Sequence, residues 1–128
     1  MRQLTNMLLI TNEVSIKNNN LPAGPYKVAP KFTRNISKHV DGRSAVELVA
    51  EITNTEENPF PVDIRVSMTG IFDTRGFKEE EVDSFLKINA VQILFPYIRT
   101  TISNITSGAF MAPIILPVVD VLSLFQEE

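Results

Sequence analysis

The chain has 128 residues, a length typical of one domain, and 44% of them are hydrophobic, enough for a substantial core. The absence of cysteine excludes a disulfide scaffold and a thiol nucleophile, and a single histidine excludes a histidine-rich metal site. The formal net charge of −3 argues against nucleic acid as the default partner. No stretch has the length and hydrophobicity of a signal-peptide core or a spanning helix. We therefore expect residues 1–128 to form one domain of a soluble, cytoplasmic protein without membrane insertion.

Up to about residue 78, apolar and polar residues alternate in four runs. A period of two is typical of strands with one buried and one solvated face, so we expect the apolar residues of each run to share a face. Asp41-Gly42 lies between the second and third runs and favours a hairpin. In chain order, the apolar sets are Leu8, Ile10, Val14 and Ile16, interrupted by Asn12; Tyr26, Val28, Phe32 and Ile36; Val46, Leu48, Ala50 and Ile52; and Val62, Ile64, Val66 and Met68. The pattern predicts a four-stranded antiparallel sheet.

The rest of the chain has a helical period. Residues 79–81 are all glutamate and suit the first turn of a helix, where carboxylates complement the positive end of the dipole. Apolar residues then recur at helical spacing as far as Ile105, and Gly108 is the expected end. Pro96 is expected to kink this long helix or to open a second one. Residues 118–125 are predicted to form a short C-terminal helix. Four strands followed by helices indicate an α+β fold.

Few residues are suited to catalysis. His39 could act as a general base, but its parity places it on the solvated face of the second strand. Glu79, Glu80 and Glu81 could ligate a metal, yet consecutive helical positions point in different directions, so a solvated helix start is the better interpretation. We therefore expect a protein that is not an enzyme and that uses no cofactor and no metal.

The apolar connector over residues 109–119 is the unusual feature of the chain. Connectors normally run over the surface and are polar. One as apolar as this is buried within its own domain, buried between subunits, or used as a binding surface, and these three alternatives stay open. Ile71 and Phe72 fall on opposite faces of the fourth strand, which indicates that its solvated face is covered near one end.

Several motifs follow one another in a set order. Gly70-Ile71-Phe72 closes a strand, and the run Ile93-Leu94-Phe95-Pro96-Tyr97-Ile98-Arg99 comes about twenty residues later. Ser107-Gly108-Ala109-Phe110 then precedes the Pro-containing connector and a final segment, Asp120 to Phe125. In order and spacing the chain resembles the bacterial protein-export chaperone family SecB over residues 26–125. The resemblance implies a four-stranded antiparallel sheet with a long helix and a short C-terminal helix, assembled as a homotetramer, a dimer of dimers.

The resemblance also implies a function. SecB is a holdase without catalytic activity that binds unfolded or non-native preproteins in apolar grooves, keeps them competent for translocation by the Sec pathway and passes them to the motor SecA. By position, the implied groove residues of this chain are Phe110, Met111, Ile114, Ile115, Leu116, Leu122, Ile64, Val66 and Met68. For Ile64, Val66 and Met68, packing in the core or between subunits is at least as good an interpretation.

Two departures from the family pattern count against SecA as a partner. The family usually carries a strongly acidic face and an acidic tail for that docking, whereas this chain is mildly acidic and has Arg65 at an acidic docking position. One alternative is a SecB-like chaperone dedicated to one client, such as the antitoxin of a toxin–antitoxin system. From other classes, the alternatives are a non-chaperone oligomeric structural module and a small-ligand carrier or hot-dog-type thioesterase, which would need polar residues in a closed pocket.

Overall fold

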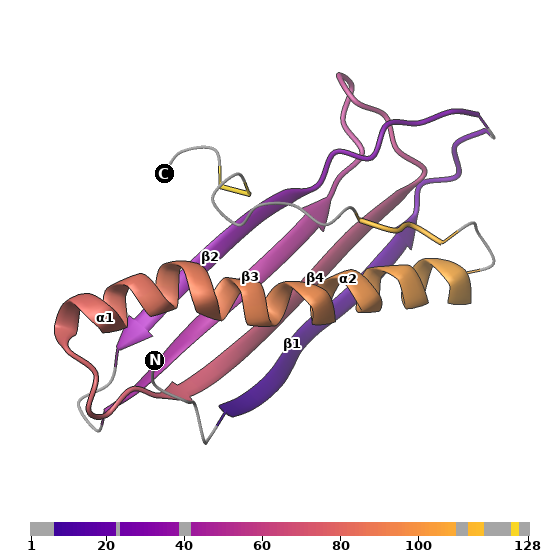
Figure 1. Ribbon diagram of the computed structural model, residues 1–128. Coiled ribbons are helices and arrows are strands. Elements are labelled where there is room, and N and C mark those ends of the chain that lie inside the picture. Colours follow the sequence, from indigo (N-terminus) through magenta and orange to yellow (C-terminus); the bar gives the residue numbers. More distant parts are fainter. Residues whose placement is uncertain (1–6, 23, 39–41, 110–112, 117–123, 126–128) are drawn as a thin grey trace.

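The computed structural model describes residues 7–22, 24–38, 42–109, 113–116 and 124–125. Four strands are followed by one long helical segment (Figure 1). The strands are β1 (Met7–Asn18), β2 (Lys31–Lys38), β3 (Arg43–Ile52) and β4 (Val62–Asp73), and the helical segment consists of α1 (Glu79–Ser84), η1 (Phe85–Asn89) and α2 (Ala90–Gly108). The predicted α+β class is confirmed. Of the predicted C-terminal helix, only Leu124 and Phe125 are among the described residues.

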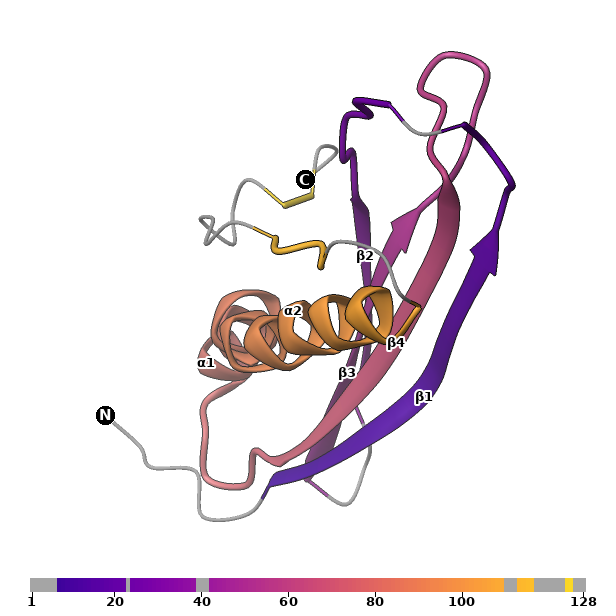
Figure 2. The same cartoon turned by 90° about the vertical axis from the view of Figure 1, so that its right-hand side faces the viewer.

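The strands form a single antiparallel sheet in the order β1-β4-β3-β2. β1 and β2 are therefore the two edges, and the helices lie across one face only (Figure 2). We call this face the helix face and the opposite one the outer face. Gly42 lies in the turn between β2 and β3 with φ of 85°, a conformation that glycine adopts readily and other residues rarely do. The predicted antiparallel sheet and its β2–β3 hairpin are both confirmed.

The predicted apolar sets of β3 and β4 lie on the helix face. All eight residues of the two sets are buried there, with exposed fractions of 6% or less. The second set is only half correct, because β2 begins at Lys31 and leaves Tyr26 and Val28 in the preceding loop. Phe32 and Ile36 do lie within β2 and pack against the core.

A β-bulge at Asn12 interrupts the alternation within β1. One inserted residue reverses the face to which the following side chains point. Leu8 and Ile10 consequently lie on the outer face, whereas Val14 and Ile16 lie on the helix face. The prediction that these four residues share a face is wrong, because a strict period of two along the sequence takes no account of an inserted residue. Asn12, the polar residue that interrupts the set in the sequence, is the bulged residue.

The helical segment runs without a break from Glu79 to Gly108. The helix begins at the acidic run, as predicted, and the backbone N–H of Lys78 donates to the carboxylate of Glu81 at 2.7 Å, a capping bond that the sequence analysis did not predict. Pro96 lies inside α2 at an exposed position, so the alternative that it opens a second helix is wrong. The sequence reasoning did not anticipate η1, a turn of π-helix within the segment.

The core lies between the helix face of the sheet and α2. The buried stripe of α2 includes Leu94, Ile98 and Ile102, none of which exposes any surface. Burying one such side chain contributes roughly 1.5–3 kcal/mol to folding. Ile114, Leu116 and Phe125, which come after α2 in the chain, belong to the same cluster. In the part of the chain that the structure describes, no helix is long and apolar enough to cross a membrane.

Candidate functional site

Six of the nine predicted groove residues are described by the structure: Ile64, Val66, Met68, Ile114, Ile115 and Leu116. Phe110, Met111 and Leu122 lie outside the described residues, as does His39. The six fall into two groups, three on β4 and three on the connector.

The β4 group lies inside the molecule. Ile64, Val66 and Met68 expose 2%, 0% and 4% of their surface and belong to the core cluster beneath the helices. Their burial matches the packing interpretation that the sequence left open for them. In this conformation they could contact another molecule only if the layer above the sheet moved.

The connector group alternates between inside and outside. Ile114 and Leu116 are buried, with exposed fractions of 8% and 1%, while Ile115 between them exposes 68% of its surface. We call residues 113–116 the strap. Its alternation is that of an extended segment lying with one side on an apolar surface. Of the three alternatives for the connector, burial within its own domain accounts for Ile114 and Leu116 but leaves Ile115 exposed.

Two hydrogen bonds from α2 hold the strap. The hydroxyl oxygen of Thr106 accepts the backbone N–H of Ile114 at 2.8 Å and donates to the carbonyl oxygen of Ile102 at 2.9 Å. The guanidinium of Arg99 donates through Nε to the carbonyl oxygen of Leu116. Along the chain, Thr106 follows Arg99, but its strap partner Ile114 precedes Leu116, the partner of Arg99. The strap therefore runs antiparallel to α2. We call Thr106 and Arg99 the clamp.

A third contact attaches the described end of the C-terminal segment. The guanidinium of Arg34, on β2, lies 4.3 Å from the centre of the Phe125 ring, a cation–π arrangement. The same guanidinium donates through Nη1 to the carbonyl oxygen of Lys87 in η1 at 2.7 Å. Arg34 thus links an edge strand, the π-helical turn and the C-terminal segment.

The strap and α2 lie side by side over the helix face of the sheet (Figures 1 and 2). The cluster that contains the buried strap residues also includes Ile52, Phe60 and Val62, from the end of β3 through the start of β4. The layer over the sheet therefore has two parts, a helix and an extended apolar segment.

The clamp is the part of the site that sequence reasoning missed. Arg99 falls within a motif already noted, but nothing in the sequence indicates a bond to a carbonyl seventeen residues further on. Thr106 carries a clearer signal in the sequence, because it follows Ile98 and Ile102 at intervals of four and so falls on the apolar side of α2, where it is fully buried. Its hydroxyl donates within the helix to Ile102, which leaves the oxygen able to accept a further hydrogen bond from a neighbouring segment.

The outer face of the sheet is polar at its centre, where an arginine is paired with carboxylates. Arg65 forms ion pairs with Glu13 on β1 at 2.8 Å and with Glu51 on β3 at 3.1 Å. On the same face, Glu47 accepts hydrogen bonds from Ser67 and Asn35. These bonds, that of Ser67 most strongly, lower the pKa of the Glu47 carboxyl group below its ordinary value. The positive charge of Arg65 is therefore surrounded by carboxylates of the same molecule.

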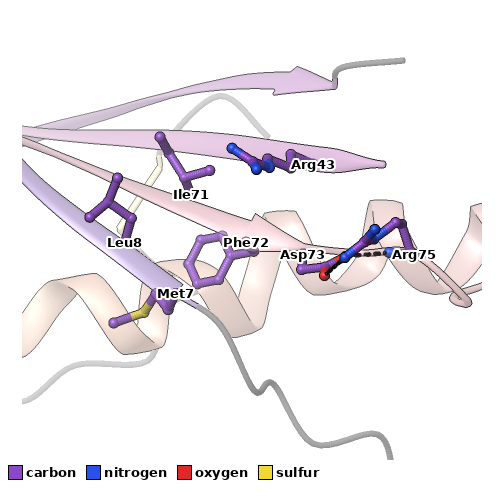
Figure 3. Close-up of a pocket in the computed structure, with 7 residues that line it drawn as sticks. All are labelled: Met7, Leu8, Arg43, Ile71, Phe72, Asp73 and Arg75. Atoms are coloured by element: carbon purple, nitrogen blue, oxygen red, sulfur yellow. Dashed lines mark hydrogen bonds and ion pairs between the residues drawn. The ribbon is translucent and has the colours of Figure 1, made fainter. Parts of the chain in front are cut away.

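A hollow of about 260 Å³ lies at the end of the sheet where β1 begins and β4 ends (Figure 3). Leu8 and Ile71 contribute apolar walls, and Asp73 and Arg75 form an ion pair at 2.6 Å beside them. The bond to Arg75 lowers the pKa of Asp73 to about 2. The remaining lining residues are Met7, Arg43 and Phe72. The sequence indicated a covered outer face near Ile71; the structure places a half-buried Ile71 at this hollow.

Comparisons with known proteins agree with the fold. A family model described as preprotein translocase subunit SecB matches residues 6–128. An uncharacterized protein of Methanocaldococcus jannaschii is 38% identical over 79 residues, which are 59% of this chain and 51% of the relative, so the chain spans about half of that protein's length. The protein-export protein SecB of Methylococcus capsulatus is 28% identical over 132 residues, or 99% of this chain and 85% of the relative.

One solved structure is similar over nearly the whole chain. It is a SecB-like chaperone of Mycobacterium tuberculosis in complex with a peptide from an antitoxin. The TM-score is 0.74 with 14% sequence identity, and the match covers 92% of this chain and 90% of the other. At that identity the likeness establishes a shared fold.

Proposed function

Since the chain belongs to the SecB family, we propose that it is a holdase chaperone, which binds unfolded or non-native polypeptides in apolar grooves and keeps them competent for translocation by the Sec pathway. Its action would be binding rather than catalysis, because burial of apolar client side chains supplies the free energy. That burial contributes roughly 25 cal/mol per Å² before the cost of ordering the client.

The observation that carries the proposal is the strap. This extended apolar segment exposes 68% of Ile115 at the surface, between two buried neighbours. A surface that accepts many sequences should be apolar and should impose few obligatory hydrogen bonds. We propose that the connector and the final segment supply the groove lining, through Phe110, Met111, Ile114, Ile115, Leu116 and Leu122, and that Ile115 makes the first contact with a client.

We further propose that the chain assembles as a homotetramer, a dimer of dimers. β1 supports this proposal because it is a twelve-residue edge strand with exposed apolar side chains. Met7, Leu8, Ile10 and Val14 expose 40%, 57%, 38% and 42% of their surface. A long apolar edge promotes uncontrolled pairing unless it is covered, and a second copy of the chain would cover it.

SecA is a partner to be tested separately. On the outer face, the carboxylates of Glu13 and Glu51 are already paired with Arg65. Charges that are already paired attract a third charge less strongly than free ones do. We therefore propose client holding as the central function and treat delivery to SecA as a second question.

A chaperone dedicated to one client, such as an antitoxin, is the second candidate. It is favoured by the similarity of fold to the mycobacterial SecB-like chaperone, which was solved with an antitoxin peptide. A non-chaperone oligomeric module remains the candidate from another class. It would share the apolar strap but would have no affinity for unfolded chains.

Binding to one slow-folding protein, presented in unfolded and native forms, tests these candidates. We expect tight binding to the unfolded form alone, by an assembly whose mass from light scattering corresponds to a tetramer. Equal or absent binding to both forms would contradict general holdase function. In that case, binding to one antitoxin peptide would separate the dedicated chaperone from the structural module.

A further inference from the structure

The strap has the chemistry of the client that the protein is proposed to hold. It is extended and apolar, and it alternates buried and exposed side chains over an apolar surface. Ile114 and Leu116 are predicted groove residues, yet both point into the core and are 8% and 1% exposed. With the strap in this position, a client could reach Ile115 but neither of its neighbours.

The clamp uses two polar groups, the hydroxyl of Thr106 and the guanidinium of Arg99, that apolar packing beside α2 does not require. Thr106 exposes no surface and faces the apolar cluster, where valine would have nearly the same shape but no hydroxyl. Its hydroxyl instead holds the N–H of Ile114, while Arg99 holds the carbonyl of Leu116. The two bonds act on the two ends of the segment Ile114 to Leu116, so both must break before this segment can leave α2.

We propose that the strap is an intramolecular stand-in for the client and that Thr106 and Arg99 are positioning residues that control its release. Clamped, the strap covers the apolar surface beside α2. Released, it opens that surface and frees Ile114 and Leu116 to contact a client. This inference rests on the holdase function proposed above, and it adds a step that limits binding.

The proposal predicts the sign of a mutational effect. When only a fraction of molecules is open, the apparent affinity is the intrinsic affinity multiplied by that fraction. Weakening the clamp raises the open fraction and should tighten client binding. If the strap were instead a fixed wall of the groove, loosening it would weaken client binding.

Thr106→Val tests this sign, with Thr101→Val as its matched control. Thr101 also donates its hydroxyl to the carbonyl four residues earlier, that of Tyr97, on a partly exposed side of α2. The probe is reduced, carboxymethylated α-lactalbumin, which stays unfolded. We expect Thr106→Val to bind it about threefold to tenfold more tightly, and Thr101→Val to bind it like the unchanged chain. Amide hydrogen exchange at Ile114 should accelerate in Thr106→Val alone.

A reversible cross-link tests the same step without relying on a weakened fold. The chain has no cysteine, so Thr106→Cys/Ile114→Cys contains only the two introduced thiols, and denaturing electrophoresis without reductant distinguishes a disulfide within one chain from one between chains. We expect the oxidised form to bind the probe at least about tenfold more weakly than the reduced form of the same molecule. Equal affinities of the two forms, or weaker binding by Thr106→Val than by Thr101→Val, would overturn the proposal.

The outcomes separate this inference from the function on which it rests. Probe binding by the unchanged chain, with no difference between oxidised and reduced variants, would leave the holdase function standing and remove the strap step. Binding by Thr106→Val where the unchanged chain binds nothing would support the strap step. Failure of the unchanged chain and of every variant to bind would overturn both.

Discussion

At the scale of single residues, a chain of polar contacts crosses the outer face and involves all four strands. Asn12 on β1 donates to Ser67 on β4 at 3.1 Å, and Ser67 donates to Glu47 on β3 at 2.5 Å. Asn35 on β2 donates to the other oxygen of Glu47 at 3.0 Å. The bulged Asn12 therefore takes part in the network, and Glu47 is its central acceptor.

The first prediction concerns this carboxylate. Its pKa lies below the ordinary 4.5 because Ser67 and Asn35 donate to the charged form. A depressed folded-state pKa contributes stability above the unfolded-state value, and this contribution is lost as pH falls through the folded-state pKa. We expect Glu47→Gln to lower the free energy of unfolding by about 1 kcal/mol at pH 7. The difference between the two chains should shrink as pH falls below 4.5, as measured by urea denaturation.

The matched comparison is Glu57→Gln, at an exposed loop position. It should leave the free energy of unfolding within about 0.5 kcal/mol of the unchanged chain at every pH. A Glu47→Gln difference that stayed constant from pH 7 to pH 3 would show that the lost bonds, rather than the ionisation of Glu47, determine the effect.

At the scale of elements, β4 depends on a glycine for its contact with α2. A Cβ built on Gly70 would lie 2.8 Å from the ring of Phe72 and 3.3 Å from the side chain of Leu94. Phe72 and Leu94 expose no surface, so neither can move aside into solvent. The glycine of the Gly70-Ile71-Phe72 motif therefore permits close packing of strand, ring and helix.

We expect Gly70→Ala to lower the free energy of unfolding by about 1–3 kcal/mol through overpacking. Gly108→Ala is the control, because a Cβ there meets nothing within 4 Å at the end of α2. Thermal and urea unfolding of both variants would check the contrast. Equal effects of the two substitutions would show that the backbone entropy of glycine, rather than contact with Phe72 and Leu94, determines the result.

At the scale of the whole molecule, β1 carries exposed apolar side chains on both faces. Leu8 and Ile10 add an exposed apolar corner to the outer face, and Val14 adds an exposed apolar residue on the helix face. In an isolated chain this edge would be a site of uncontrolled association. A second copy of the chain pairing along β1 would cover both groups at once.

Leu8→Glu tests this account of the assembly. We expect it to lower the mass of the oligomer in light scattering while changing the free energy of unfolding of the chain by less than about 0.5 kcal/mol. Val28→Glu introduces the same charge at a position of similar exposure, 40%, in the loop before β2. Dissociation by both variants, or by neither, would remove β1 from the interface.

Much of the fold follows from local patterns. The alternation in β3 and β4, the glutamates that begin the helical segment and the apolar connector are each visible within a few neighbouring residues. Period and capping express local backbone geometry, which is why the α+β class and the antiparallel sheet could be predicted. The motifs from Gly70 onwards allowed the family to be predicted as well, because they specify an order of elements that periodicity alone leaves open.

Only the tertiary structure decided which surfaces are exposed. The bulge at Asn12 reversed the faces of β1 after Thr11, and the strap, packed beside α2, exposes Ile115 while it buries Ile114 and Leu116. The charge of Arg65 was likewise balanced by Glu13, fifty-two positions earlier in the chain. Each of these outcomes depends on contacts between residues distant in sequence. Alternation within a single run shows which side chains share a face. It does not show which distant backbone group or charge a given side chain contacts.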